Sequence, residues 1–293
     1  MTHVSQWCMK DISVKTIKTL VDDIYSLWDP KVETVIPQEH LDNFTKTVSN
    51  KLVERLGEDK QNRSTRMSNV GNPCHREMWY WHNTPHLARK QHPSTLIKFF
   101  YGDILEALML MLAKVAGHEV TDEQTKLDFQ GVPGSCDGVI DGVLVDVKSA
   151  SPLSFKKFEK HLDRQDDTFG YLTQLGLYNH AKFKGENKPA AFLAVDKVHG
   201  TLKLDVHHDL SDVNYLRLVS ERKQAIELPE PPPRPYTDEP EGKSGNRSLK
   251  VKCSYCRFSK TCWPGLRAFS YSGDSVTYLT HVERLPRVPE IEA

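Results

Sequence analysis

The spacing of hydrophobic and polar positions predicts a chain in which helices and strands alternate. Apolar residues recur at helical spacing in some segments and alternate with polar residues in others. The predicted helices cover residues 12–28, 38–56, 75–82, 95–116, 154–161, 168–183 and 211–227. The predicted strands cover residues 118–129, 134–140, 143–149, 190–196 and 201–206. This order indicates an α/β protein, or α+β in the looser sense, with a mixed central sheet flanked by helices.

A proline-rich segment divides the chain near its C-terminal end. Residues 228–235 read Leu-Pro-Glu-Pro-Pro-Pro-Arg-Pro, which is typical of a stiff linker. We therefore expect an N-terminal helical region over 1–65, a core over 66–230, and a linker with a cysteine-rich arm and tail over 231–293. The final segment, 276–293, suggests no function.

Composition indicates an ordinary water-soluble protein. Lys plus Arg and Asp plus Glu both number 39 in the 293 residues, so nucleic acid could be recruited only by a local basic patch. The most apolar stretch, 96–116, contains four charged residues and is expected to be a buried helix and not a membrane span. Met1–Lys10 lacks a secretory apolar segment. We expect a cytoplasmic protein without a membrane partner, and protein partners cannot be inferred.

The segment from Gly134 to Ser149 predicts a hairpin that carries two acids. Asp141-Gly142 between two apolar runs is a strong turn signal, and counting outward places Asp137 opposite Asp146. Opposed carboxylates repel each other, and Mg²⁺ or Mn²⁺ between them would remove the repulsion. Lys148 shares the face of Asp146 because side chains alternate along a strand. A surface hairpin with an exposed ion pair is the alternative.

Four of the six cysteines have metal-ligand spacing. Cys253, Cys256 and Cys262 form a C-x2-C-x5-C run, and Cys74 supplies a fourth thiolate. Four thiolates suit either zinc or an iron–sulfur cluster, and His75 leaves a mixed zinc site open. The remaining two cysteines, Cys8 and Cys136, lack partners at such spacing and are expected to be structural; Cys136 should face the core.

The acidic hairpin and its flanking motifs resemble the PD-(D/E)XK nuclease superfamily, in its RecB-like branch. Asp137-x8-Asp146-x-Lys148 is similar to the signature of the superfamily, and Gln174 and Tyr178 match the Q-x-x-x-Y motif of that branch. Upstream, Gly102-x-x-x-Glu106 stands where the family has G-x-x-x-H.

The resemblance implies a restriction-endonuclease-like core and a metal site. In its terms Glu106, Asp137, Asp146 and the Val147 carbonyl hold one or two Mg²⁺ or Mn²⁺ ions, Lys148 assists the reaction, and Gln174 and Tyr178 position the strand. Because this chain has Glu106 where the family has histidine, neighbouring Asp103 is an alternative ligand. An ion pair of Glu106 with a core Lys or Arg is the structural alternative.

The cysteine pattern is similar to the iron–sulfur subgroup of this branch, which includes AddB-type and CRISPR spacer-acquisition nucleases. The resemblance implies a [4Fe–4S] cluster on Cys74, Cys253, Cys256 and Cys262, with zinc as the alternative. A single compact chain with no helicase, recognition domain or dimerisation signal further indicates a DNA exonuclease for recombination, repair or replication, of the kind a bacteriophage can encode, acting on linear single- or double-stranded DNA. The alternatives are a structure-specific endonuclease and a non-catalytic DNA-binding module with a zinc site.

The arm is the expected contact surface for DNA. Residues 242–273 contain no Asp or Glu, and basic residues there alternate with aromatic ones that can stack on bases. The basic residues are Lys243, Arg247, Lys250, Lys252, Arg257, Lys260 and Arg267, and the aromatic ones are Tyr255, Phe258, Trp263, Phe269 and Tyr271. Lys156, Lys157 and Lys160 are further candidates for phosphate contacts. The alternative is a solvated tail whose aromatic residues pack around the cluster.

Overall fold

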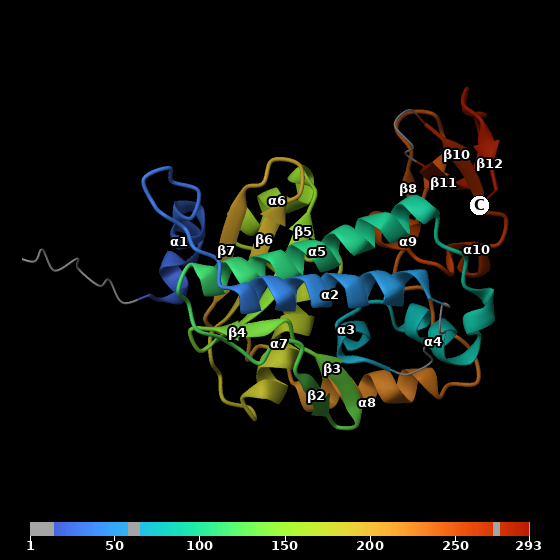
Figure 1. Cartoon of the computed structure of the whole chain (residues 1–293). Helices are drawn as coiled ribbons and strands as arrows, with labels where there is room; N and C mark the ends of the chain where they lie inside the picture. The colour runs from blue at the N-terminus through green and yellow to red at the C-terminus, as the bar shows by residue number, and fades with distance from the viewer. Residues whose placement is uncertain (1–14, 58–64, 272–275, 293) are drawn as a thin grey trace, which may run out of the picture.

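The computed structural model describes residues 15–57, 65–271 and 276–292, and a mixed five-stranded sheet lies at its centre (Figure 1). The strand order is β1-β4-β5-β6-β7; β5 and β6 are parallel, and the other neighbours are antiparallel. The strands are β1 (Val120–Thr121), β4 (Gly138–Ile140), β5 (Val143–Ala150), β6 (Ala190–Asp196) and β7 (Leu202–His207). The predicted mixed α/β class is confirmed.

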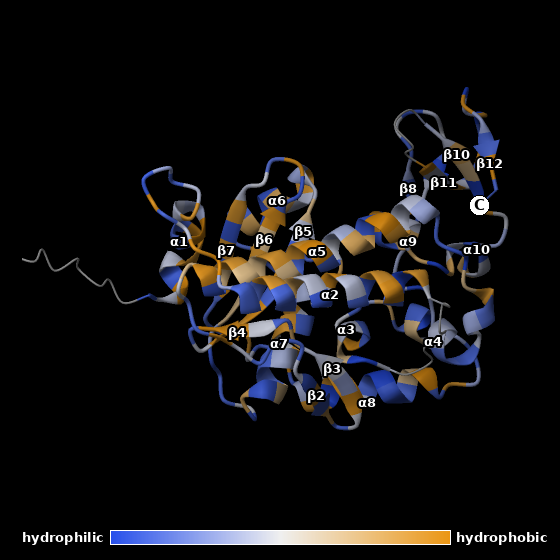
Figure 2. Cartoon of the chain, in the orientation of Figure 1, coloured by the Kyte–Doolittle hydropathy of each residue, from blue (hydrophilic) through white to orange (hydrophobic). Residues whose placement is uncertain are grey.

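Helices cover both faces of this sheet, and each face has its own hydrophobic core. One core packs the sheet against α1 (Leu20–Ser26) and α5 (Pro93–Val115), with α2 (Gln38–Leu56) lying along α5. The helices on the other core are α3 (Met67–Val70), α4 (His75–Asn83), α6 (Pro152–Glu159), α7 (Tyr171–Lys182) and α8 (Tyr215–Ile226). Figure 2 shows α5 and the central strands as largely hydrophobic and α8 as largely hydrophilic.

Most predicted elements have the bounds that their periodicity indicates, but the region before the hairpin differs. The predicted strand 118–129 is split into β1 and β2 (Lys126–Phe129), because Asp122 and Gln124 take positive φ values of 56° and 50°. The predicted strand 134–140 is likewise interrupted between β3 (Val132–Ser135) and β4. Of the predicted helix 12–28, only α1 and a preceding 3-10 turn, Ile17–Thr19, form helix, and residues 12–14 lie outside the described residues.

The C-terminal region forms a second five-stranded sheet that the sequence did not predict. Its order is β12-β10-β11-β9-β8, and Figure 1 shows it beside the N-terminal end of α5. The elements are β8 (Glu239–Pro240), β9 (Arg247–Ser248), α9 (Val251–Ser254), α10 (Ser259–Cys262), β10 (Arg267–Ser270), β11 (Val276–His281) and β12 (Glu290–Ile291). We refer to residues 236–292, where described, as the C-terminal arm.

The proline-rich segment before the arm is packed against α4. The Arg76 guanidinium donates hydrogen bonds to the carbonyls of Pro231 (3.1 Å) and Pro232 (2.5 Å). The Trp79 indole N–H donates to the Leu228 carbonyl at 2.8 Å. These contacts hold the start of the arm next to the segment that carries Cys74. In the part of the chain described here, no helix is both long and apolar enough to cross a membrane.

Candidate active site

The β4–β5 hairpin has the predicted register. Ile140 pairs with Val143, Val139 with Leu144 and Gly138 with Val145, so the next position outward sets Asp137 against Asp146. Both turn residues, Asp141 and Gly142, have positive φ (49° and 78°), as a two-residue hairpin turn requires. The Asp141 carboxylate accepts a hydrogen bond from the Glu119 amide at 3.1 Å, which fixes the turn to the end of β1.

Two acids and a lysine meet at the open end of this hairpin, away from solvent. Asp146 is only 5% exposed, and Lys148 Nζ lies 2.5 Å from its Oδ2. The Val147 amide donates to Asp137 Oδ2 at 2.8 Å. The burial contradicts the alternative of an exposed surface ion pair, since exposed pairs of that kind are solvated on all sides.

The site has more negative groups than its one lysine can neutralise. Burial, with Asp146 and Glu106 nearby, raises the pKa of Asp137 well above its usual range. Burial lowers the pKa of Lys148, but Asp146 and Asp137 outweigh this and raise it overall, so the lysine stays charged. Burial also raises the pKa of Glu106 to about 7, with Asp146 opposing and Lys51 favouring ionisation. A divalent cation would relieve this excess.

The donor atoms suit a hard divalent cation. Asp146 Oδ2 is buried and makes no hydrogen bond of regular geometry within the described chain, although Lys148 is close. Carboxylate oxygens are the ligands that Mg²⁺ and Mn²⁺ prefer. Val147 contacts Asp137 through its amide, and a metal-ligand role for its carbonyl stays a prediction.

Glu106 reaches the site from α5 and is held by a residue that the sequence did not single out. The Gln124 side-chain amide donates to Glu106 Oε1, while Gln124 Oε1 accepts from the Ser135 hydroxyl at 3.2 Å. Glu106 and Gln124 also line a cavity of about 320 Å³ between α2 and α5. Within the described residues Glu106 makes no ion pair, which contradicts the structural alternative for it.

Asp103, the alternative ligand, is engaged elsewhere. Its carboxylate accepts two hydrogen bonds from the Arg55 guanidinium, at 2.7 and 2.9 Å. This bidentate pair ties α5 to α2, whereas Glu106 is bonded to Gln124 and has Asp146 near enough to raise its pKa.

Gln174 and Tyr178 lie one turn apart on α7, beside the acids. Gln174 hydrogen-bonds to Tyr178, and burial, with Asp146 nearby, raises the pKa of Tyr178 to about 12. The helix starts at Gly170, which has φ 79° and lies so close to Gly71 that a side chain would meet the Gly71 carbonyl. The Q-x-x-x-Y pair is thus anchored to the segment just before Cys74.

A row of rings extends from Lys148 to the arm, and only Tyr255 among them was a candidate in the sequence. Lys148 Nζ lies 4.9 Å from the ring centre of Tyr171, and Phe169 stacks on Tyr171 at 5.8 Å. Tyr255 of the arm meets Phe169 edge-on at 5.9 Å, and Lys252 lies 5.6 Å from the Phe169 ring. We call Tyr171, Phe169 and Tyr255 the aromatic row. Phe169 and Tyr171 are neighbours in the sequence, but Tyr255 is distant from both, so no local pattern could have joined it to them.

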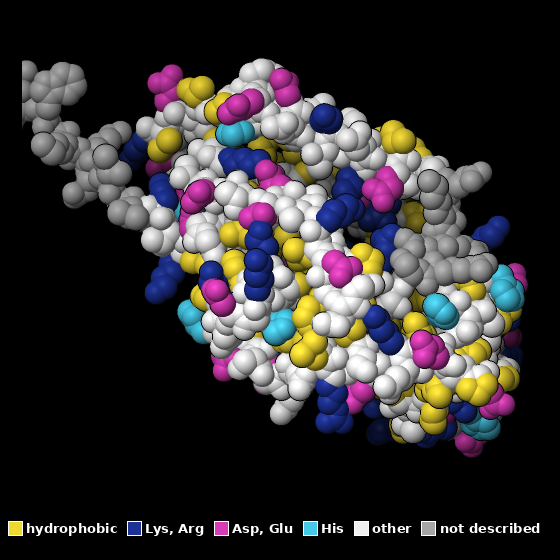
Figure 3. All heavy atoms as spheres, turned by 90° about the horizontal axis from the view of Figure 1, so that it is seen from below, with side chains coloured by type: hydrophobic (Ala, Val, Ile, Leu, Met, Phe, Trp, Pro, Cys, Tyr) yellow, Lys and Arg dark blue, Asp and Glu magenta, His cyan; other side chains and the backbone are white. Residues whose placement is uncertain are grey.

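The basic residues of the arm are mostly paired, contrary to the expectation of a free positive surface. Arg247 pairs with Asp238 (2.7 Å) and Arg267 with Glu290 (2.6 Å). Lys252 lies 3.1 Å from Glu77. In Figure 3, Lys and Arg side chains are interspersed with Asp and Glu over the face seen from below. Lys157 is also engaged, donating to the Asp166 carbonyl at 2.6 Å.

The aromatic residues of the arm divide into buried and exposed. Phe258 is fully buried against Tyr80 and Trp81, Phe269 is buried, and Arg234 covers the Trp263 ring at 4.1 Å. Tyr255, in contrast, is 72% exposed. The alternative of packing around the cysteines holds for Phe258, which lines their cavity, whereas Phe269 is buried within the second sheet. Tyr255 remains available for stacking.

The four candidate cysteines line a single cavity between α4 and the arm. Cys74, Cys253, Cys256 and Cys262 share its wall with Tyr80, Arg234 and Trp263, whereas His75 is not part of it. The Cys74 thiol caps α4 by accepting from the Glu77 amide at 3.4 Å. Burial, with Cys74 and Cys262 nearby, raises the pKa of Cys253 to about 11, and burial raises the pKa of Cys256 as well. Without a cation the thiols of Cys253 and Cys256 stay protonated; a bound metal would stabilise their thiolates.

The other two cysteines lie apart from this cavity or outside the description. Cys136 is buried in the core that packs against α7 and α8. Cys8 lies outside the described residues.

Comparison with known proteins gives distant structural likenesses. No protein-family model and no curated protein matches the chain. The structure of SSO0001 is 17% identical over 74% of this chain and 95% of that chain, with a TM-score of 0.45. The alkaline exonuclease LHK-Exo from Laribacter hongkongensis is 12% identical over 55% of this chain and 85% of that chain, with a TM-score of 0.36. The structure of LHK-Exo in complex with dAMP is 13% identical over 57% of this chain and 85% of that chain, with a TM-score of 0.37. At these values the likeness decides nothing about activity.

Proposed function

We propose that this protein is a metal-dependent deoxyribonuclease of the PD-(D/E)XK type that degrades DNA from free ends. The observation that carries the proposal is the buried Asp146, ion-paired with Lys148, with Asp137 and Glu106 near enough to affect one another's ionisation. Within the described residues the three acids do not have ligand atoms that all lie within 4.8 Å of one another, so a cation would have to draw them together. Such a group is costly to bury unless it holds a positively charged ligand. Mg²⁺ or Mn²⁺ on these oxygens would supply an acidic water and neutralise charge on the phosphate.

The protein's own residues then have distinct roles. Lys148 stays charged and can stabilise negative charge that develops on the phosphate oxygens. Tyr178, with its pKa raised to about 12, stays protonated at neutral pH and can donate a hydrogen bond to the strand. Gln174 orients the Tyr178 hydroxyl. The cavity between α2 and α5 gives access to Glu106, which is the one of the three acids that lines it.

The test is the degradation of linear and covalently closed circular DNA with Mg²⁺ or Mn²⁺. The wild type should consume linear DNA and spare circles, and Asp146→Asn should lower the rate by at least about 100- to 1000-fold, as expected for a group that stabilises transition-state charge. Glu159→Gln is the matched control, since Glu159 is an exposed acid at the end of α6.

Two other results would change the conclusion. Cutting of circles by the wild type but not by Asp146→Asn would indicate an endonuclease with the same site. If the wild type binds DNA but leaves every substrate intact with both metals, the protein is a binding module and the nuclease proposal is wrong.

We further propose that the cysteine cavity holds a [4Fe–4S] cluster with a structural role. A single tetrahedral zinc ion would draw thiolate sulfurs to within about 3.8 Å of one another, given Zn–S bonds of about 2.3 Å. Among the described residues, these cysteines do not form a group of three ligand atoms within 4.8 Å. A cubane cluster binds each thiolate to a different iron and therefore fits a wider arrangement. Bound to all four cysteines, it would join the Cys74 segment to the arm.

A further inference from the structure

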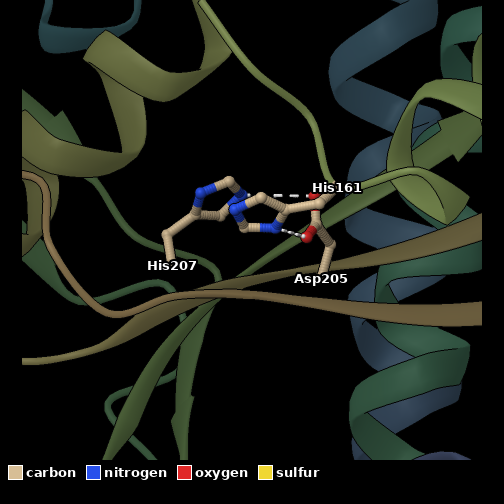
Figure 4. Close-up of side chains that lie close together, drawn as sticks. All are labelled: His161, Asp205 and His207. Atoms are coloured by element: carbon tan, nitrogen blue, oxygen red, sulfur yellow. Dashed lines mark hydrogen bonds and ion pairs between the residues drawn. The ribbon is translucent and has the colours of Figure 1, made fainter.

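A second group of metal-ligand side chains lies on β7, away from the candidate catalytic acids. His161 follows α6, and Asp205 and His207 are two residues apart on one face of β7 (Figure 4). The ligand atoms of these three side chains all lie within 4.8 Å of one another. We call them the His–Asp–His group.

Both imidazoles point to one buried carboxylate. His161 Nδ1 lies 2.6 Å from Asp205 Oδ1, and His207 Nε2 lies 3.2 Å from Asp205 Oδ2. The Asp205 side chain is 2% exposed, whereas that of His161 is 61% exposed. The two rings stack with centres 4.4 Å apart, as Figure 4 shows.

The backbone supports this arrangement at some cost. His161 has φ 68°, a left-handed conformation that is uncommon for residues other than glycine. The Leu162 amide donates to Asp205 Oδ2 at 3.0 Å and so fixes the chain on the far side of His161. The orientation of the Asp205 carboxylate is therefore fixed by both imidazoles and by the backbone.

From this geometry we infer that His161, Asp205 and His207 form a binding site for a transition-metal dication, with Zn²⁺ as the expected occupant. Two imidazole nitrogens and one carboxylate oxygen are a donor set that zinc accepts, and water can complete the coordination on the exposed side of His161. Zinc–nitrogen bonds of about 2.0–2.1 Å bring tetrahedral ligands to about 3.3 Å apart, which rotation of the exposed His161 can provide.

The site is separate from the catalytic one and independent of the proposed nuclease activity. Asp146 pairs with Phe192 across β5 and β6, and Phe192 pairs with Asp205 across β6 and β7. Two strand spacings put Asp146 and Asp205 about 10 Å apart on the same face, too far to share one ion. A metal here would secure the segment between α6 and α7, which leads to Gln174 and Tyr178.

The test compares metal content and thermal stability in two matched variants. His161→Asn removes a ligand but keeps a residue that tolerates positive φ, so folding is preserved. His199→Asn is the control, because His199 Nδ1 pairs with Asp196 at 2.9 Å and has the same exposure without belonging to a three-ligand group. Proteins are incubated with Zn²⁺, dialysed, and analysed for zinc per chain and for the midpoint of thermal unfolding with and without the ion.

We expect wild type and His199→Asn to keep about one more zinc per chain than His161→Asn and to be stabilised more by Zn²⁺. Zinc held by the cysteine cavity contributes equally to all three proteins and cancels. Substitution of Co²⁺ should add weak visible bands without thiolate charge transfer, and these should be lost in His161→Asn. Equal zinc content and equal stabilisation in the three proteins would mean that the group is a hydrogen-bonded clamp, and the inference would be overturned. Neither readout depends on DNA cleavage.

Discussion

At the scale of single residues, the charge of Glu106 depends on pH in the range where the protein would work. Burial raises its pKa to about 7, and only the ionised carboxylate can bind a cation. The Kd for Mn²⁺ should therefore fall as pH rises through about 7, by about tenfold per unit below that value for one competing proton. Isothermal titration calorimetry between about pH 6 and about pH 8 measures this dependence.

The two acids of α5 provide a matched pair of variants for that measurement. Glu106→Gln should weaken Mn²⁺ binding at least about 10-fold, since even outer-shell partners of a metal contribute roughly 10- to 100-fold, and should flatten the pH dependence. Asp103→Asn should leave both unchanged, because Asp103 is bound to Arg55. If Asp103→Asn weakens Mn²⁺ binding and Glu106→Gln does not, Asp103 is the metal ligand and Glu106 is not.

The ionisation of Glu106 should also affect the stability of the metal-free protein, and here rising pH should be unfavourable. Because Glu106 has a higher pKa in the folded state than its ordinary 4.5, the metal-free folded protein binds an extra proton between these values. The free energy of unfolding should decrease as pH rises from about 4.5 through about 7, and Glu106→Gln should reduce this decrease, leaving the part that is due to Asp137. Urea unfolding in the presence of a chelator is the measurement, and a pH-independent difference between the two proteins would contradict the assignment.

At the scale of elements, the aromatic row predicts how a strand leaves the active site. Tyr255 is exposed on the arm and continues the row that begins at Lys148, so a base can stack on it. Tyr255→Ala should weaken binding of single-stranded DNA by roughly 1–3 kcal/mol, the usual contribution of one stacked base. Fluorescence anisotropy in the Asp146→Asn background measures binding without cleavage.

A distant exposed aromatic residue is the control for this prediction. Trp28 is 64% exposed and follows α1, at the other end of the molecule from the arm in Figure 1. Trp28→Ala should leave the affinity unchanged. Equal losses in both variants, or none in Tyr255→Ala, would show that the row does not guide the strand.

The elements also show what the sequence could and could not predict. Periodicity identified α2 and β6 with the observed bounds, and the Asp141-Gly142 turn gave the register that brings Asp137 opposite Asp146. The second sheet was missed because three of its five strands have two residues each, too few for a pattern. The contacts of Glu106 with Gln124 and of Phe169 with Tyr255 join distant segments, which local spacing cannot reveal.

At the scale of the whole molecule, the cysteine cavity is where the arm meets the core. Cys74 precedes α4, the other three cysteines follow the proline-rich segment, and Trp79, Tyr80 and Phe258 form a separate hydrophobic cluster beside them. A group bound to all four thiolates would restrict a very long loop in the unfolded chain. By analogy with a disulfide, its loss should cost roughly 2–5 kcal/mol.

Cys256→Ala tests this connection, with Cys136→Ala as the control that removes a buried thiol outside the cavity. After anaerobic reconstitution with iron and sulfide, wild type and Cys136→Ala should be brown and contain iron and sulfide, whereas Cys256→Ala should lose most of both. In Cys256→Ala, limited proteolysis should release the arm first, because its remaining contacts with α4 include only a small hydrophobic cluster and the ion pair of Lys252 with Glu77. If the wild type is colourless and binds zinc, the cavity is a zinc site and not a cluster site. If all three proteins are cleaved equally, packing alone holds the arm in place.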